Sequence, residues 1–328
     1  NSGRVWKITR AEIEAHRKDY LADGVVDNPI PAIFGWPGRG NEFFEQYNGF
    51  ALPDSMAFAG FEEPDMDFFN DVYEPGKGEY PRLWAGANTV TQKWAVPDEM
   101  IFFAFHTSGM QNLAKAYPFP VQVWAEAFVY HCPDNDLLEN AVFVTYRWRY
   151  EDPYRADTVI AAVFADVDLG NPQDDYHGYL PDKNLYFVYN ADGIDEGGWE
   201  REMPVFFIQS LFQPFDSNGN WVNFHLMSPG CPYSDCQLSG AAPPILSYEY
   251  FEYLSGHWLD GSPIEAGGTG YHTGGSEMPG VFPGLPDEPG AWTEFNAHNP
   301  AGNRRALLRY YLQRTNPKWI NTMTLIFG

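Results

Sequence analysis

The sequence predicts a mainly β protein, an antiparallel β-sandwich of the jelly-roll or supersandwich type. Three observations predict it. Runs rich in β-branched and aromatic residues recur, turn residues separate them, and only two stretches have a helical pattern. At 44% hydrophobic and 17% aromatic residues, the chain can bury a large core. The expected strands are Met100–His106, Val121–Cys132, Ala141–Tyr150, Thr158–Asp168, Leu185–Asn190, Val205–Phe212, Trp221–Met227, Arg304–Leu312 and Thr322–Phe327.

Two strands carry patterns that predict which residues are buried. The run from Val159 to Phe164 is apolar without a break, as in a core strand covered on both faces. The strand that begins at Val121 partly alternates, so its odd-numbered small apolar residues are expected to face the core. Gln122, Trp124, Glu126, Phe128 and Tyr130 would then lie on its other face.

Two helices are expected. Ile8–Ala22 has Thr9 as a cap, Glu12 as its capping-box partner and Gly24 at its end. Leu246–Leu259 would be capped by Ser247. Its expected buried stripe consists of Tyr250, Phe251, Leu254 and Trp258.

The expected organisation is one compact unit. An irregular N-terminal segment, residues 1–97, would pack on a β-sandwich domain, residues 98–328. Residues 28–60 are rich in Pro, Gly and aromatics, and residues 260–303 form a long Gly/Pro-rich loop region. The chain has no linker of disordered composition and no internal repeat.

Acidic residues dominate the charge. The 328 residues include 20 Lys and Arg against 44 Asp and Glu, a formal net charge of −24. A strongly acidic chain is a poor partner for nucleic acid or an anionic membrane, and it favours cations. No apolar run is long enough for a transmembrane helix. If the protein is secreted, we expect its signal peptide to have been removed already.

The main candidate site is an acidic loop that follows an apolar strand. Asp166 and Asp168 point to the same side of an extended chain. Asn171, Asp174 and Asp175 follow, and Asp192 comes after the next strand. Oxygen ligands without a nearby Cys suit Ca²⁺ best, so we expect Ca²⁺ here. The alternative is a solvated acidic loop. His177 would be a polar loop residue or an outer partner of the metal.

Catalytic motifs are missing from the sequence. It has no metalloprotease, nucleophile-elbow or phosphate-loop motif, and its eight histidines are scattered. An enzyme is therefore the less favoured reading. Eight tryptophans are candidates for stacking on sugars, although most are expected in the core: Trp84, Trp94, Trp124, Trp148, Trp199, Trp221, Trp258 and Trp292.

Two cysteines lie close together in the sequence. Cys231 and Cys236 occur in a short Pro-containing loop, CPYSDC, where a disulfide is expected in an oxidising compartment. Cys132, at the end of an apolar strand, is expected to be a buried free thiol.

The chain resembles a region of large cell-surface proteins that Bacteroidetes and related phyla export by the type IX secretion system. Six segments carry the resemblance, in the same order as in that family. They are VWKITRAEIEAHRKDY, IFGWPGRGN, VYEPGKGEYPRLWAG, FADVDLGNPQDDYHGY, LSGHWLDGSPIEAGGTGY and VFPGLPDEPGAWTEFNAHNPAGNRRALL. The resemblance implies secretion and display at the cell surface, but no particular reaction.

The resemblance also points to two weaker sites. The family's first Asp-rich loop has calcium-loop spacing, whereas this chain has Phe68 and Phe69 inside DMDFFNDVY. Asp65, Asp67, Asn70 and Asp71 are therefore a weaker second metal site. Ser55 lies in Asp-Ser-Met, which is similar to a short O-glycosylation sequon of Bacteroidetes.

These observations favour a secreted, calcium-stabilised surface protein with a structural, adhesive or assembly role. Its partners would be other cell-surface proteins, glycans or further copies of itself. One alternative is a protein that binds or degrades surface polysaccharides. Another is a subunit of an extracellular filament or sheath.

Overall fold

In the computed structural model the chain folds as two compact units. The first comprises Asn1–Thr107 and Pro120–Arg149, and the second comprises Ser108–Phe119 and Tyr150–Gly328. The first unit therefore extends past residue 97, the boundary that the sequence suggested. The structure describes residues 4–53, 58–62, 72–83, 96–107, 120–151, 159–199, 201, 203–212, 225–228, 240–312 and 320–328.

The first unit contains four antiparallel strands in the order β1-β4-β5-β6. Around them lie short helices and one small hairpin. The strands are β1 (Trp6–Thr9), β4 (Glu99–His106), β5 (Val121–Val129) and β6 (Val142–Tyr150). The other elements are α1 (Arg10–Asp23), α2 (Pro31–Phe34), α3 (Phe44–Asn48), β2 (Phe61–Glu62), η1 (Pro75–Lys77), β3 (Tyr80–Pro81) and α4 (Asp136–Glu139).

The N-terminal helix forms as its sequence predicted. The Thr9 hydroxyl accepts from the Glu12 amide at 3.2 Å, and the Thr9 amide donates to Glu12 Oε2 at 2.9 Å. Gly24 ends the helix with a left-handed φ of 81°. These contacts satisfy N–H groups that a helix start otherwise leaves without partners.

Strand β5 is buried on both faces. Val121 and Ala125 on the predicted core face are buried, and so are Gln122, Glu126 and Phe128 on the opposite face. Arg147 Nη1 donates to Glu126 at 2.7 Å and Arg149 Nη2 donates to Gln122 at 3.0 Å, so the buried polar groups have partners on β6. The predicted core face holds at Val121 and Ala125, but the opposite face is buried as well, since polar groups can be buried when they are paired.

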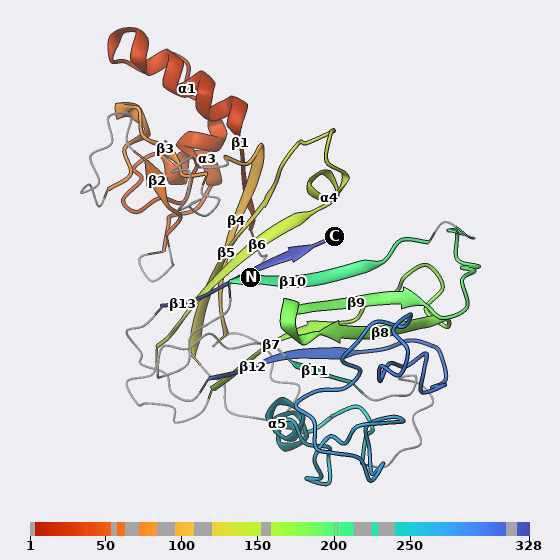
Figure 1. Ribbon diagram of the computed structural model, residues 1–328. Coiled ribbons are helices and arrows are strands. Elements are labelled where there is room, and N and C mark those ends of the chain that lie inside the picture. The colour runs from red at the N-terminus through yellow and green to blue at the C-terminus, as the bar shows by residue number, and fades with distance from the viewer. Residues whose placement is uncertain are drawn as a thin grey trace. The chain divides into compact units, whose positions relative to one another are not determined.

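The second unit contains two antiparallel sheets and one helix. Their strand orders are β13-β10-β9-β8 and β11-β12-β7, and β8, β9 and β10 run side by side (Figure 1). The elements are β7 (Val159–Ala165), β8 (Asp175–Leu180), η3 (Pro181–Lys183), β9 (Leu185–Asn190), β10 (Phe206–Phe212), β11 (His225–Met227), α5 (Ser247–Ser255), β12 (Ala306–Leu312) and β13 (Ile320–Phe327). The mainly β, antiparallel fold class is thereby confirmed.

Strands β7 and β8 differ from their expected environments. β7 is not covered on both faces, since Phe164 is 57% exposed. It is also the outermost of the described strands in its sheet. The sequence placed Asp175 to His177 in a loop, but they begin strand β8 and are buried. β8 contains polar residues, so it has no apolar run that would predict a buried strand. Its burial depends on pairing with β9 and on the loop region that packs against it.

Helix α5 is shorter than expected. It begins at Ser247, with the Glu249 carboxylate accepting from the Ile245 and Leu246 amides at 2.7 and 2.8 Å, so Ser247 is not the cap. Phe251 is 54% exposed, whereas Tyr253 is buried. The expected stripe was wrong because the helix ends at Gly256, before Trp258 can share its face.

The long loop region after α5 is ordered by contacts with strand β8. The Tyr179 amide donates to the Phe282 carbonyl at 3.2 Å, and the Gly284 amide donates back to the Tyr179 carbonyl at 3.1 Å. Gly302 adds a third backbone bond, to the Asp175 carbonyl. Among the described residues, no helix has the length and apolar character needed to cross a membrane.

Candidate functional site

Two acidic loops of the second unit meet at a place that we call the acidic corner, residues 166–175 and 190–196 together with Asn303. Asp195 joins the loops. Its buried carboxylate accepts backbone N–H bonds from Asn171 at 2.7 Å, Gly197 at 2.9 Å and Trp199 at 2.8 Å. These bonds lower the pKa of Asp195. The sequence reading missed this residue, although the Gly197-Gly198 pair after it signals a tight turn.

Asp175 is a buried carboxylate of the corner with only one of its oxygens satisfied. It is only 1% exposed, and its Oδ2 accepts from the Leu169 amide at 3.0 Å. Its Oδ1 is buried without a hydrogen-bond partner. Burial, helped by the nearby charges of Asp174 and Asp168, raises the pKa of Asp175 to about 7.

The two aspartates after β7 contact the segment that precedes β12. Arg305 Nε donates to Asp166 Oδ2 at 3.1 Å, so this carboxylate already has a cation beside it. Asn303 Nδ2 donates to Asp168 Oδ1 at 3.1 Å. The carbonyl oxygen of the Asn303 side chain is buried and has no hydrogen-bond partner. Only the fold could identify Asn303, because it lies 135 residues from Asp168 in the chain.

The remaining predicted ligands differ in what they can offer a cation. Asp174 Oδ1 is buried without a hydrogen-bond partner, and burial raises the pKa of this carboxyl. Asn171 Nδ2 donates to Glu196 Oε2 at 3.2 Å. Asp192 is exposed and accepts from the Ile194 amide at 3.0 Å, so its side chain stabilises the turn in which it lies.

The corner thus offers three buried oxygen atoms without hydrogen-bond donors, on Asp174, Asp175 and Asn303. Acceptor oxygens of this kind suit a hard cation, since coordination to a cation can replace the hydrogen bond that each oxygen lacks. Across the described ranges, however, no three His, Cys, Asp or Glu side chains form a group that could hold a metal ion. A cation would therefore need the amide oxygen, backbone carbonyls or water as further ligands.

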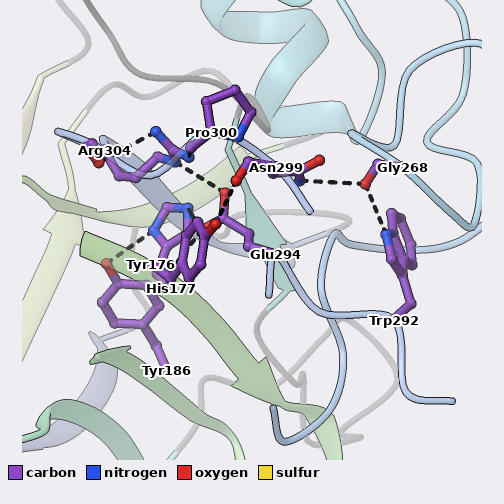
Figure 2. A network of polar contacts seen from close by, with 10 residues as sticks. Tyr176, His177, Tyr186, Gly268, Trp292, Glu294, Asn299, Pro300 and Arg304 are labelled. Atoms are coloured by element: carbon purple, nitrogen blue, oxygen red, sulfur yellow. Dashed lines mark hydrogen bonds and ion pairs between the residues drawn. The ribbon is translucent and has the colours of Figure 1, made fainter. Parts of the chain in front are cut away.

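Beside the corner, β8 anchors a buried charge network (Figure 2). Arg304 Nε donates to Glu294 Oε1 at 3.0 Å, and the His177 amide donates to Glu294 Oε2 at 2.8 Å. Burial lowers the pKa of His177, so the ring is neutral. The idea that His177 is a loop residue was wrong, because it is fully buried in β8.

The network continues through neutral groups into the long loop region. His177 Nδ1 lies 3.3 Å from the Tyr186 hydroxyl, and Tyr176 donates its hydroxyl proton to the Asn299 carbonyl (Figure 2). Arg304 also donates to the carbonyls of Gly302 and Pro300. Glu294 and His177 are fully buried, and the network ties the long loop region to β8.

Several predicted residues lie outside the described residues. These are Asp65, Asp67, Asn70 and Asp71, Ser55, and the expected disulfide partners Cys231 and Cys236. Cys132 is a half-buried free thiol. Of the tryptophans within the described ranges, Trp258 is buried and Trp199 is 52% exposed.

Comparison with known proteins adds no assignment. The chain matches no protein-family model, and neither a curated protein nor a solved structure is significantly similar to it.

Proposed function

We propose that this chain is a secreted cell-surface protein with a structural, adhesive or assembly role, stabilised by Ca²⁺ at the acidic corner. One observation carries the calcium part of the proposal. The buried corner contains three side-chain oxygens with no hydrogen-bond donor, on Asp174, Asp175 and Asn303. The cell-surface part rests on the resemblance to proteins of the type IX secretion system.

Charge supports a divalent cation at this place. Asp168, Asp174, Asp175 and Asp195 interact electrostatically near one buried carboxyl, and Arg305 pairs with Asp166 instead. Removing carboxylates from water is costly unless a counter-charge accompanies them. Ca²⁺ accepts six to eight oxygen ligands in flexible geometry, so it can add backbone and water oxygens to this set.

The test is thermal unfolding of the full chain in CaCl₂ and in EGTA at equal ionic strength, with MgCl₂ as a second cation. We expect Ca²⁺ to stabilise the folded state by about 2.7 kcal/mol at a concentration roughly 100 times its Kd. Asp175→Asn should remove most of this gain while keeping an acceptor for Leu169. Asp182→Asn, an exposed change in η3, is the matched control. An unchanged wild-type midpoint on adding Ca²⁺ would refute the calcium part.

A polysaccharide-binding role is the second candidate. Trp199 favours it, because this tryptophan is half exposed and its backbone amide bonds to Asp195 of the acidic corner. An exposed aromatic residue close in the chain to a cation site could add a stacking surface to oxygen coordination. Glycan-array binding with and without Ca²⁺ tests it. A Trp199→Ala variant that binds glycans as the wild type does would exclude this surface.

A further inference from the structure

A short segment without regular secondary structure leads from the long loop region into β12. We call this segment, residues 299–305, the strap. Its backbone bonds to β8 through the Gly302 amide, which donates to the Asp175 carbonyl at 3.2 Å. The Tyr176 hydroxyl donates to the Asn299 carbonyl at the start of the strap. The strap therefore docks on the first residues of β8, where the carboxylate of Asp175 is buried.

Two side chains of the strap contact the carboxylates that follow β7. Asn303 Nδ2 donates to Asp168 Oδ1 at 3.1 Å, and Arg305 Nε donates to Asp166 Oδ2 at 3.1 Å. The side-chain oxygen of Asn303 is buried and has no hydrogen-bond partner. The other two buried oxygens of the acidic corner without donors belong to the acidic loop and the start of β8. The oxygens that suit a cation thus come from two segments that are distant in the chain.

We propose that Ca²⁺ at the acidic corner regulates the docking of the strap on β8. The inference rests on the calcium part of the proposed function and specifies what the cation controls. A cation bound by oxygens of both segments loses a ligand when the strap moves away. Ca²⁺ therefore favours the docked strap by the difference between its affinities for the docked and the open state. The Ca²⁺ concentration sets how often the strap opens and uncovers Asp175.

The unsatisfied oxygens give the strap a reason to open when no cation is bound. Docking keeps Asp175 Oδ1 and Asn303 Oδ1 away from water without giving either atom a donor. Leaving a buried acceptor unsatisfied is costly, and opening the strap lets water satisfy both atoms. Coordination to Ca²⁺ satisfies them while the strap stays docked. The buried ion pair of Arg304 with Glu294 has no such need, so it holds the loop region whether or not Ca²⁺ is bound.

Hydrogen–deuterium exchange of the full chain tests the proposal, followed by mass spectrometry at one pH in CaCl₂ and in EGTA at equal ionic strength. At roughly 100 times the Kd for Ca²⁺, we expect exchange in the strap, which includes the Gly302 amide, to slow by about 10- to 100-fold. The turn at Gly270, whose amide donates to the Gly267 carbonyl at 2.9 Å, is the control segment. It should exchange at the same rate in both solutions.

Variants of Asn303 test whether the strap supplies a ligand. Asn303→Ala removes the side-chain oxygen and should abolish most of the slowing by Ca²⁺. Asn303→Asp keeps an oxygen and adds a charge, so it should retain the slowing even if the alanine variant folds poorly. Asn296→Ala, an exposed change earlier in the same loop region, is the matched control and should behave as the wild type does.

The outcomes separate this inference from the proposed function. If Ca²⁺ raises the thermal midpoint but slows the strap no more than the control segment, the inference is overturned and the calcium part of the proposed function stands. If Ca²⁺ changes neither the midpoint nor the exchange, both are overturned. Slowing in Asn303→Ala equal to that in the wild type would also overturn the inference, because the strap would then supply no ligand.

Discussion

At the residue scale, the molecule keeps its buried charges by pairing them. Glu294 is fully buried, and burial raises the pKa of its carboxyl, while Arg304 and the His177 amide oppose that rise. Arg304 in turn satisfies its guanidinium on one carboxylate and two backbone carbonyls. The pair ties the loop region to β8. The buried carboxylate of Glu294 accepts hydrogen bonds on both oxygens, whereas Asp174 and Asp175 of the acidic corner each have an oxygen without a donor.

Removing Glu294 should expose the cost of an unpaired buried cation. Glu294→Ala leaves Arg304 without its carboxylate, and we expect a loss of about 3–5 kcal/mol in the free energy of unfolding. Urea denaturation of the full chain measures it. Glu288→Ala, an exposed change in the same loop, should stay within about 0.5 kcal/mol of the wild type. Replacing both Glu294 and Arg304 by Met should cost less than Glu294→Ala alone. Equal losses for the two glutamate variants would contradict the anchoring role.

At the element scale, a residue from another element lies at the C-terminal end of helix α5. The helix has no basic residue in its last turn. Arg309 of β12 is buried there, and its side chain donates to the Pro279 carbonyl. A Cβ on Gly256 would lie 2.5 Å from Arg309 Nη2. A cation at this end complements the helix dipole, which explains how an arginine without a carboxylate partner among the described residues is tolerated.

Two glycines offer a matched test of this packing. Gly256 and Gly261 both have left-handed backbone, with φ of 89° and 80°. A Cβ on Gly261 would meet nothing within 4 Å. Gly261→Ala should therefore cost only the conformational penalty of about 1 kcal/mol. Gly256→Ala should cost about 1–3 kcal/mol more, because the buried Arg309 has to move. Thermal unfolding of both variants gives the comparison. Equal midpoints would show that the Arg309 side chain can move away from the new methyl group without loss of stability.

At the scale of the whole molecule, net charge should limit stability. The chain carries −24 charges at neutral pH, and like charges on a folded protein repel more than on an expanded chain. The described ion pairs include exposed ones, such as Lys7 with Glu99, that contribute little. Salt and cations are therefore expected to favour the folded state by screening the excess negative charge.

Raising NaCl should increase the midpoint of thermal unfolding by a few degrees. Between about 0.02 M and about 0.5 M, the Debye length falls from roughly 20 Å to roughly 4 Å, so repulsion between separated carboxylates is largely lost. Calorimetry at pH 7 with EGTA present measures this general effect apart from that of Ca²⁺. A midpoint that falls on adding NaCl would mean that ion pairs, rather than the excess charge, dominate.

Local sequence patterns predict the fold class and most of the longer elements. Strand β9 appears over the predicted residues, and β4 and α1 differ by only one or two residues at their ends. Local causes account for this success: β-branched and aromatic runs, turn residues and the Thr9–Glu12 capping box act over a few neighbouring positions. The acidic composition of the corner was likewise visible, from Asp166 to Asp175.

Contacts between distant segments determine which of these residues are buried and what they face. Asp175 and His177 are buried because β9 pairs with β8 and the loop region covers it. Glu294 accepts from the His177 amide, and Asn303 donates to Asp168, each across more than 100 residues of the chain. Glu126 became a core residue through Arg147 on the neighbouring strand. Burial and charge pairing are sums over contacts between distant segments, so no local pattern contains them.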